Sequence, residues 1–168
     1  PFHKIKCVYI GDGRNNTAHS LMIGAAKVGM SLINLAPKSL WPTKDFLELM
    51  QSISENPQAK ITCDDEISLS VKQADVIYTD VWVSMGEEDK FAERIELLTP
   101  YQINMEMIEK TGNDDVIMLH CLPAFHDTKT QYSQEIAETF GMREMEVTDA
   151  AFRSKHGLQF EQAENRMH

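Results

Sequence analysis

Apolar positions along the chain fall into two patterns, short β-rich runs and longer segments with helical spacing. The short runs predict strands at residues 5–10, 31–36, 60–63, 75–79 and 116–119. Helical spacing predicts helices at residues 17–29, 44–54, 65–72, 87–98, 104–110, 131–140, near 149 and at 161–168. Strands that alternate with helices are typical of βαβ units. We therefore expect one doubly wound, Rossmann-like α/β domain with a parallel sheet and helices on both faces.

Polar loops follow the first, fourth and fifth predicted strands, at residues 11–16, 80–86 and 120–127. In doubly wound sheets, ligands bind outside the carboxyl ends of the strands. We therefore expect these three loops to form the functional site.

Composition narrows the possible partners. The net charge is −10 and no basic stripe occurs, so a nucleic-acid partner is not expected. A bilayer span needs about 18 consecutive apolar residues, and no such run occurs, so no membrane partner is expected either. With 168 residues and 42% apolar content, the chain can bury the core of one domain.

The three cysteines, Cys7, Cys63 and Cys121, are odd in number and lack CxxC spacing, which favours a reducing, cytoplasmic location. Cys7 and Cys63 stand in strand-like apolar runs and are predicted to be core residues. The chain opens on Pro1 and enters a strand almost at once, with no basic, apolar leader. We expect it to begin inside a longer protein.

The first loop, GDGRNN at residues 11–16, invites comparison with a dinucleotide-binding turn. The third glycine of that fingerprint is missing, because Asn16 stands there. The second strand ends in Ala36-Pro37-Lys38, without an acid to hold a ribose. Nicotinamide binding is therefore disfavoured, and no cofactor is expected. A tight turn whose asparagines cap the next helix is an alternative interpretation.

The second loop, DVWVSMG at residues 80–86, is unusually apolar for a segment beyond a strand end. One interpretation is a mobile lid that excludes water, with Asp80 and Ser84 binding an amine or a carboxylate. The other is a buried loop with Trp82 in the core. The pattern does not separate them.

The third loop contains four potential metal ligands, His120, Cys121, His126 and Asp127. Neighbours on an extended chain face opposite ways, so His120 and Cys121 rarely reach one metal. The same geometry keeps His120 from serving as base to a nucleophilic Cys121. We therefore expect no metal site here.

Residue patterns alone do not assign a role to two further positions. Pro123 is a candidate for a cis peptide bond, which would turn the carbonyls of Cys121 and Leu122 inward as acceptors. Arg166, near the end of the chain, is by itself most simply a solvated or salt-bridging residue.

Together, GDGRNN, DVWVSMG, HCLPAFHD and ENRMH resemble, in order and interval, the second half of ornithine carbamoyltransferases. The resemblance covers essentially all 168 residues. DxWxSMG is its most specific element, because it marks the ornithine enzymes. HCLP is similar in aspartate carbamoyltransferases.

For ornithine, the resemblance implies that Asn16 contacts the α-carboxylate and Asp80 the α-ammonium. It also implies that Ser84 and Met85 close over the amino-acid end.

For carbamoyl phosphate, it implies contacts from Cys121 and Leu122, partly through backbone carbonyls. Arg166 would help to hold the carbamoyl oxygen, with Cys121 and Arg166 the catalytic residues and His120 in a supporting role.

The chain also departs from the family. It has no Ser-Thr-Arg-Thr phosphate loop and no closing helix after residues 166–168. We therefore expect a fragment with half an active site, from a parent that uses L-ornithine and carbamoyl phosphate and forms homotrimers or larger homo-oligomers. A carbamoyltransferase for putrescine or another amine, and a non-catalytic amino-acid-binding module, are the alternatives.

Overall fold

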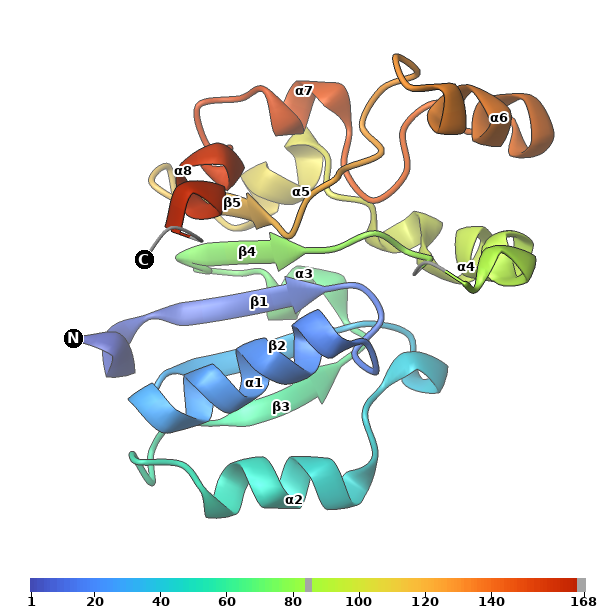
Figure 1. The fold of residues 1–168 in the computed structure, drawn as a ribbon. Helices are drawn as coiled ribbons and strands as arrows, with labels where there is room; N and C mark the ends of the chain where they lie inside the picture. Colours follow the sequence, from blue (N-terminus) through green and yellow to red (C-terminus); the bar gives the residue numbers. More distant parts are fainter. Residues whose placement is uncertain (84–85, 166–168) are drawn as a thin grey trace.

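The computed structural model describes residues 1–83 and 86–165, and its centre is one parallel sheet (Figure 1). The strand order is β3-β2-β1-β4-β5. The strands are β1 (Lys6–Ile10), β2 (Ser31–Leu35), β3 (Ile61–Asp64), β4 (Val76–Thr79) and β5 (Ile117–His120). The prediction of a doubly wound parallel sheet is confirmed.

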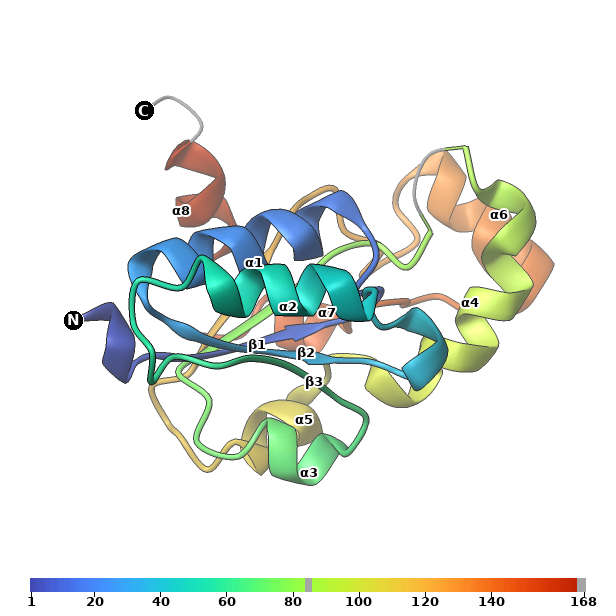
Figure 2. The ribbon, with the colours of Figure 1, turned by 90° about the horizontal axis from the view of Figure 1, so that it is seen from below.

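Helices cover both faces of the sheet (Figure 2). They are α1 (Asn16–Val28), α2 (Lys44–Ser52), α3 (Ile67–Ser70), α4 (Phe91–Leu98), α5 (Met105–Lys110), α6 (Gln131–Phe140), α7 (Asp149–Phe152) and α8 (Gln159–Glu164). Short 3₁₀ turns lie at Phe2–Lys4, Lys38–Leu40, Glu88–Lys90 and Thr99–Tyr101. None of the helices in the described ranges is long and apolar enough to cross a membrane.

Side chains of β1 point alternately to the two faces of the sheet and contribute to an apolar cluster on each face. Cys7 and Tyr9 pack with residues of α1 and α2 in one buried cluster. Val8 and Ile10 belong to a second cluster with residues of α3, α5 and α7. Successive side chains of a strand point to opposite faces, so one short apolar strand anchors both layers.

The strand order changes direction at β1. The chain moves from β1 through β2 to β3 on one side, and then returns to place β4 and β5 on the other. The carboxyl ends of β1 and β4 are neighbours, because Ile10 pairs with Thr79. In open α/β sheets this reversal is where a crevice for ligands forms.

The segment after β4 is buried at its start. Trp82 is 2% exposed and Val83 7% exposed. Both belong to a third cluster with residues of α4 and α6, which lie beyond the carboxyl ends of the strands (Figure 1). The buried-loop interpretation is therefore confirmed for Trp82 and Val83, because residues of α4 and α6 pack around both side chains. Ser84 and Met85 lie outside the described residues.

Element boundaries differ from the sequence prediction in several places. The helix predicted at residues 65–72 is shortened to Ile67–Ser70, and Gln73 beyond it has a left-handed φ of 57°. The helix predicted at residues 87–98 begins as a 3₁₀ turn before α4. The last helix begins at Gln159, earlier than expected, and Arg166 lies outside the described residues.

A buried ion pair joins the turn after β1 to α4. Arg94 Nη2 lies 3.0 Å from Asp12 Oδ2, and the two side chains are 4% and 10% exposed. Arg14 pairs with the same carboxylate at 3.1 Å, but its side chain is 45% exposed. Arg94 is therefore the partner that compensates the buried charge of Asp12.

We expect Arg94→Leu to lower the free energy of unfolding by about 3–5 kcal/mol, because removing one partner leaves the other charge buried. Arg14→Leu is the matched control, since it removes the exposed partner of the same carboxylate and should cost at most about 1 kcal/mol. Urea denaturation of both variants measures the difference. Equal losses would contradict the assignment of Arg94 as the dominant partner.

Candidate functional site

Three chain segments meet at the carboxyl edge of the sheet. Register pairs Ile10 with Thr79 and Thr79 with His120, so the residues that follow β1, β4 and β5 emerge side by side. The backbone N–H of Cys121 donates to the Thr79 carbonyl at 3.2 Å, which extends the pairing one residue beyond the strand. This pairing places the starts of the three loops next to one another, as the sequence predicted.

The turn after β1 depends on a glycine at position 13. A Cβ atom at Gly13 would lie 1.9 Å from Oδ1 of the buried Asn34, so a side chain there would force Asn34 to move. The N–H of Gly13 donates to the Leu40 carbonyl at 3.0 Å, and the N–H of Gly11 donates to the Leu35 carbonyl at 3.2 Å. The two backbone hydrogen bonds and the close approach of Asn34 therefore fix the path of the chain into α1.

The two asparagines of the turn have different surroundings. Asn15 is the N-cap of α1, accepting from Ala18 N–H at 2.7 Å, and its Nδ2 donates to Tyr9 Oη at 2.8 Å. Asn16 is exposed, and its side chain makes no hydrogen bond within the described part of the chain. The capping interpretation is confirmed for Asn15, which leaves Asn16 available to a ligand.

Asp80 follows β4, and both of its carboxylate oxygens have partners. Oδ1 accepts from the N–H of Val81 at 2.8 Å, and Oδ2 accepts from the hydroxyl of Thr17 at 2.7 Å. The side chain is half-buried. Thr17 Oγ1 also lies 3.6 Å from Cys121 Sγ, so α1 and the ends of β4 and β5 are joined through one side chain. Thr17 was not predicted from the sequence, because the GDGRNN motif ends one residue before it.

Tyr9 and Tyr78 belong to the strands beneath this cluster, with stacked rings whose centroids are 6.3 Å apart. Burial raises the pKa of Tyr78 to about 12, with smaller contributions from Cys121 and Asp80. Burial, followed by the charge of Asp80, also raises the pKa of Tyr9 well above its usual value. Both phenols therefore stay neutral at physiological pH.

His120 faces away from Cys121, as predicted for neighbours at a strand end. Its Nε2 lies 3.1 Å from Glu146 Oε1, and both side chains are fully buried. Its Nδ1 accepts from the N–H of Leu122 at 2.8 Å, so the ring proton belongs on Nε2, from which it donates to Glu146. The same Glu146 oxygen accepts from the N–H of Phe125. His120 and Glu146 together hold the backbone of the third loop.

Leu122 carries the unusual backbone of this loop. Its φ is 53°, and the Leu122–Pro123 peptide bond is cis, as the sequence suggested. A left-handed conformation at a non-glycine residue costs on the order of 1–3 kcal/mol. The hydrogen bond from its N–H to the buried His120 ring helps to hold that conformation.

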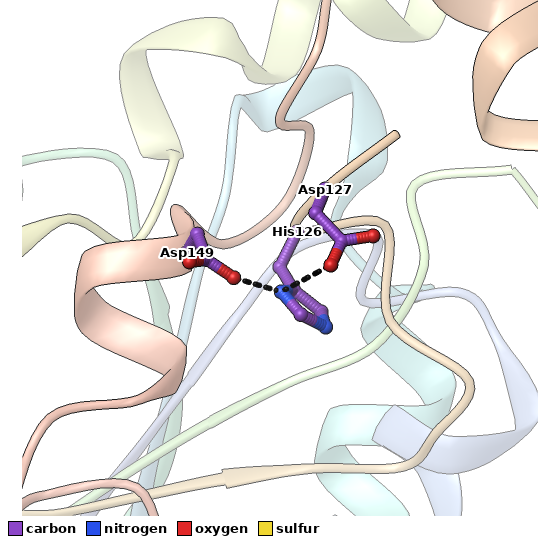
Figure 3. A group of neighbouring side chains, drawn as sticks. All are labelled: His126, Asp127 and Asp149. Atoms are coloured by element: carbon purple, nitrogen blue, oxygen red, sulfur yellow. Dashed lines mark hydrogen bonds and ion pairs between the residues drawn. The ribbon is translucent and has the colours of Figure 1, made fainter. Parts of the chain in front are cut away.

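His126, Asp127 and Asp149 form a separate polar group (Figure 3). His126 Nδ1 lies 2.7 Å from Asp149 Oδ1 and 3.9 Å from Asp127 Oδ2. Cations already pair with these carboxylates, Arg153 with Asp149 at 2.8 Å and Lys129 with Asp127 at 3.2 Å. The group is an ion-pair network, and it lowers the pKa of Asp149, chiefly through Arg153 and then His126.

The four potential metal ligands of the third loop are thus divided in the structure. His120 pairs with Glu146, Cys121 contacts Thr17, and His126 and Asp127 turn to Asp149. Of the proposed substrate-binding residues, Asn16, Asp80, Cys121 and Leu122 follow the carboxyl ends of β1, β4 and β5. Ser84, Met85 and Arg166 lie outside the described residues, and their roles stay predictions.

Comparison with known proteins gives a consistent family. Residues 3–168 match the model described as the Asp/Orn binding domain of aspartate/ornithine carbamoyltransferase. A catabolic ornithine carbamoyltransferase of Bacillus licheniformis is 58% identical over 164 residues, or 98% of this chain and 49% of that protein. One from Streptococcus agalactiae is 54% identical, with the same coverage of each chain. The chain thus spans about half the length of the curated relatives it matches.

Solved structures agree with this fold. The ornithine carbamoyltransferase of Pyrococcus furiosus superposes with a TM-score of 0.78 at 34% identity, covering 97% of this chain and 46% of that one. The anabolic enzyme of Campylobacter jejuni superposes with a TM-score of 0.78 at 31% identity, covering 97% and 48%.

The cysteines should differ in reactivity in the folded protein. Cys121 is exposed, whereas burial raises the pKa of the Cys7 thiol to about 12 and that of the half-buried Cys63 thiol to about 11. The thiolate is the reacting form, so we expect iodoacetamide at pH 8 to modify Cys121 first, Cys63 slowly and Cys7 only in denaturant. Peptide mapping by mass spectrometry measures the order. Early modification of Cys7 in the folded state would contradict this burial pattern.

Proposed function

This chain belongs to the aspartate/ornithine carbamoyltransferase family, and we propose that it is the ornithine-binding domain of an ornithine carbamoyltransferase. The parent enzyme transfers the carbamoyl group of carbamoyl phosphate to the δ-amine of L-ornithine, giving L-citrulline and phosphate. One observation carries the substrate assignment. Asp80 of the DVWVSMG segment is half-buried, with both oxygens oriented, where the strand order reverses.

The rest of the enzyme is part of this proposal. Because the chain spans about half of its relatives, we assign residues 1–168 to one domain and the main phosphate grip to another. The parent is a homotrimer or a larger homo-oligomer in the cytoplasm. It needs no metal and no organic cofactor, since the reaction involves neither redox chemistry nor an activated water.

The amino-acid end of ornithine binds between the first and second loops. The Asp80 carboxylate attracts the α-ammonium, and the exposed Asn16 amide donates to the α-carboxylate. Ser84 and Met85 close over this end. Putrescine has no carboxylate for Asn16, which favours ornithine as the substrate.

The carbamoyl end binds beside β5. Carbonyl groups of Cys121 and Leu122 accept from the carbamoyl amine, and the family resemblance assigns Arg166 to the carbamoyl oxygen. As the neutral δ-nitrogen attacks, the N–C bond forms and the C–O bond to phosphate breaks. The departing phosphate takes the proton that the nitrogen loses. Negative charge develops on the carbonyl oxygen, where a fixed guanidinium lowers the barrier. Holding two substrates in line supplies much of the remaining rate.

Cys121 acts in this scheme as a positioning contact. Its thiol lies beside the Thr17 hydroxyl, and His120 is engaged with Glu146 instead. A covalent cysteine mechanism requires a base at the thiol. The geometry therefore favours direct attack by ornithine.

The complete protein should form citrulline from ornithine and carbamoyl phosphate at about 1–10³ s⁻¹. Putrescine should be a much poorer substrate, and the isolated 168-residue chain should form no detectable citrulline. A colorimetric citrulline assay, with putrescine turnover followed by phosphate release, measures all three. Equal turnover of putrescine would favour an amine carbamoyltransferase of different specificity, and full activity of the isolated chain would overturn the half-site proposal.

In the complete protein, Asp80→Ala should weaken ornithine binding roughly 10- to 150-fold, the loss of about 1.5–3 kcal/mol for a charge-assisted contact. The KM for carbamoyl phosphate should change far less. Asp115→Ala is the control, because Asp115 is exposed and precedes β5 at the opposite edge of the sheet. Steady-state kinetics with each substrate varied in turn gives both constants. An unchanged KM for ornithine would remove Asp80 from the site.

A further inference from the structure

Thr17 is the point at which three parts of the site touch. It lies in the first turn of α1, with Oγ1 2.7 Å from Asp80 Oδ2 and 3.6 Å from Cys121 Sγ. Asp80 follows β4 and Cys121 follows β5, so this hydroxyl bridges groups that are distant in sequence. It connects the proposed ammonium contact with a proposed contact to the carbamoyl group.

The direction of these contacts follows from the number of protons. A threonine hydroxyl has one proton and two lone pairs, and an ionised carboxylate can only accept. Thr17 therefore donates to Asp80, and its own oxygen is left to accept from the Cys121 thiol. The Cys121 thiol, the Thr17 hydroxyl and the Asp80 carboxylate thus form one continuous line of contacts.

This contact restricts how Asp80 can rotate. One oxygen is held by the N–H of Val81 at 2.8 Å and the other by Thr17. A carboxylate offers about four lone-pair positions, and these two contacts from described residues use two of them. Among the described residues, the Val81 contact would then be the one left to orient the group if the hydroxyl were removed.

The hydroxyl is not needed to cap α1. Asn15 is the N-cap, and its side chain accepts from Ala18 N–H at 2.7 Å. Threonines near helix starts often satisfy backbone groups, but here both hydroxyl contacts are to side chains of the site. A purely local helical role therefore does not account for it.

We propose that Thr17 is a positioning residue that orients the Asp80 carboxylate toward the substrate's ammonium group and couples it to the Cys121 thiol. The proposal rests on the proposed function, because it takes Asp80 as the ammonium ligand. Thr17 acts through Asp80 and does not itself contact the reacting atoms.

Three substitutions in the complete protein test the role. Thr17→Val removes the hydroxyl with little change of shape and should raise the KM for ornithine about 3- to 10-fold. The KM for carbamoyl phosphate should stay within about twofold. Thr17→Ser keeps the hydroxyl and should restore most of the ornithine affinity. Thr62→Val, on the exposed side of β3, controls for the substitution itself.

A double-mutant cycle separates positioning from general disturbance. If Thr17 acts through Asp80, Thr17→Val should have no further effect on the ornithine KM in an Asp80→Asn background. Thr17→Ala is the second variant if Thr17→Val does not fold, with circular dichroism as the check on both.

The outcomes distinguish the two proposals. If Asp80→Asn raises the ornithine KM but Thr17→Val does not, the role of Thr17 is overturned and the proposed function stands. The role is also overturned if the two effects are additive, if both substrates are affected equally, or if Thr17→Ser fails to rescue. If Asp80→Asn itself leaves ornithine affinity unchanged, the proposed role of Asp80 fails first.

Discussion

The structure depends most on the parallel register of β1, β4 and β5. Pairing of Ile10 with Thr79 and of Thr79 with His120 makes three strands end level, so the next residues emerge at one edge. A shift of one residue in this register would move Asp80 away from Thr17 and reverse which side chains face the core. The positions of the residues at the carboxyl edge therefore depend on the hydrogen-bonded pairing of β1, β4 and β5.

Beyond the strand ends, where the strands no longer pair, buried polar contacts hold the loops in place. Arg94 ties the first loop to α4 through Asp12, and Glu146 ties the third loop to the sheet end through His120. These contacts are costly to form, since each buries charged or polar atoms, but they are more costly to break once formed. Such contacts specify one loop conformation where apolar packing alone would allow several.

The sequence predicted the elements better than the contacts. All five strands were found, because short β-rich runs between helical segments have few alternative structures. The burial of Trp82 was left open, since an apolar loop looks the same whether helices cover it or a ligand does. Which helices lie over that end of the sheet is decided by α4 and α6 packing together, and local sequence does not carry this information.

Sequence motifs also did not predict which side chains contact each other, because the partners lie far apart in the sequence. Thr17 meets Asp80 only because the start of α1 and the end of β4 are placed by separate crossovers. Glu146 reaches His120 from a segment with no recognisable motif, although that glutamate is completely buried. A buried acid is the clearest sign of a specific partner, but burial of a charged residue cannot be read from its type.

The charges at the described edge suit one end of the proposed reaction. Asp80 supplies a negative group, the phenols of Tyr9 and Tyr78 are neutral, and Arg14 and Arg94 are engaged with Asp12. This environment attracts an ammonium group and gives little compensation to a phosphate dianion, which needs several free donors. Under the proposed division, an ammonium ligand at one domain and a phosphate ligand at another keep the two charges apart. The proposed division of the substrates between two domains therefore agrees with the charges at this edge.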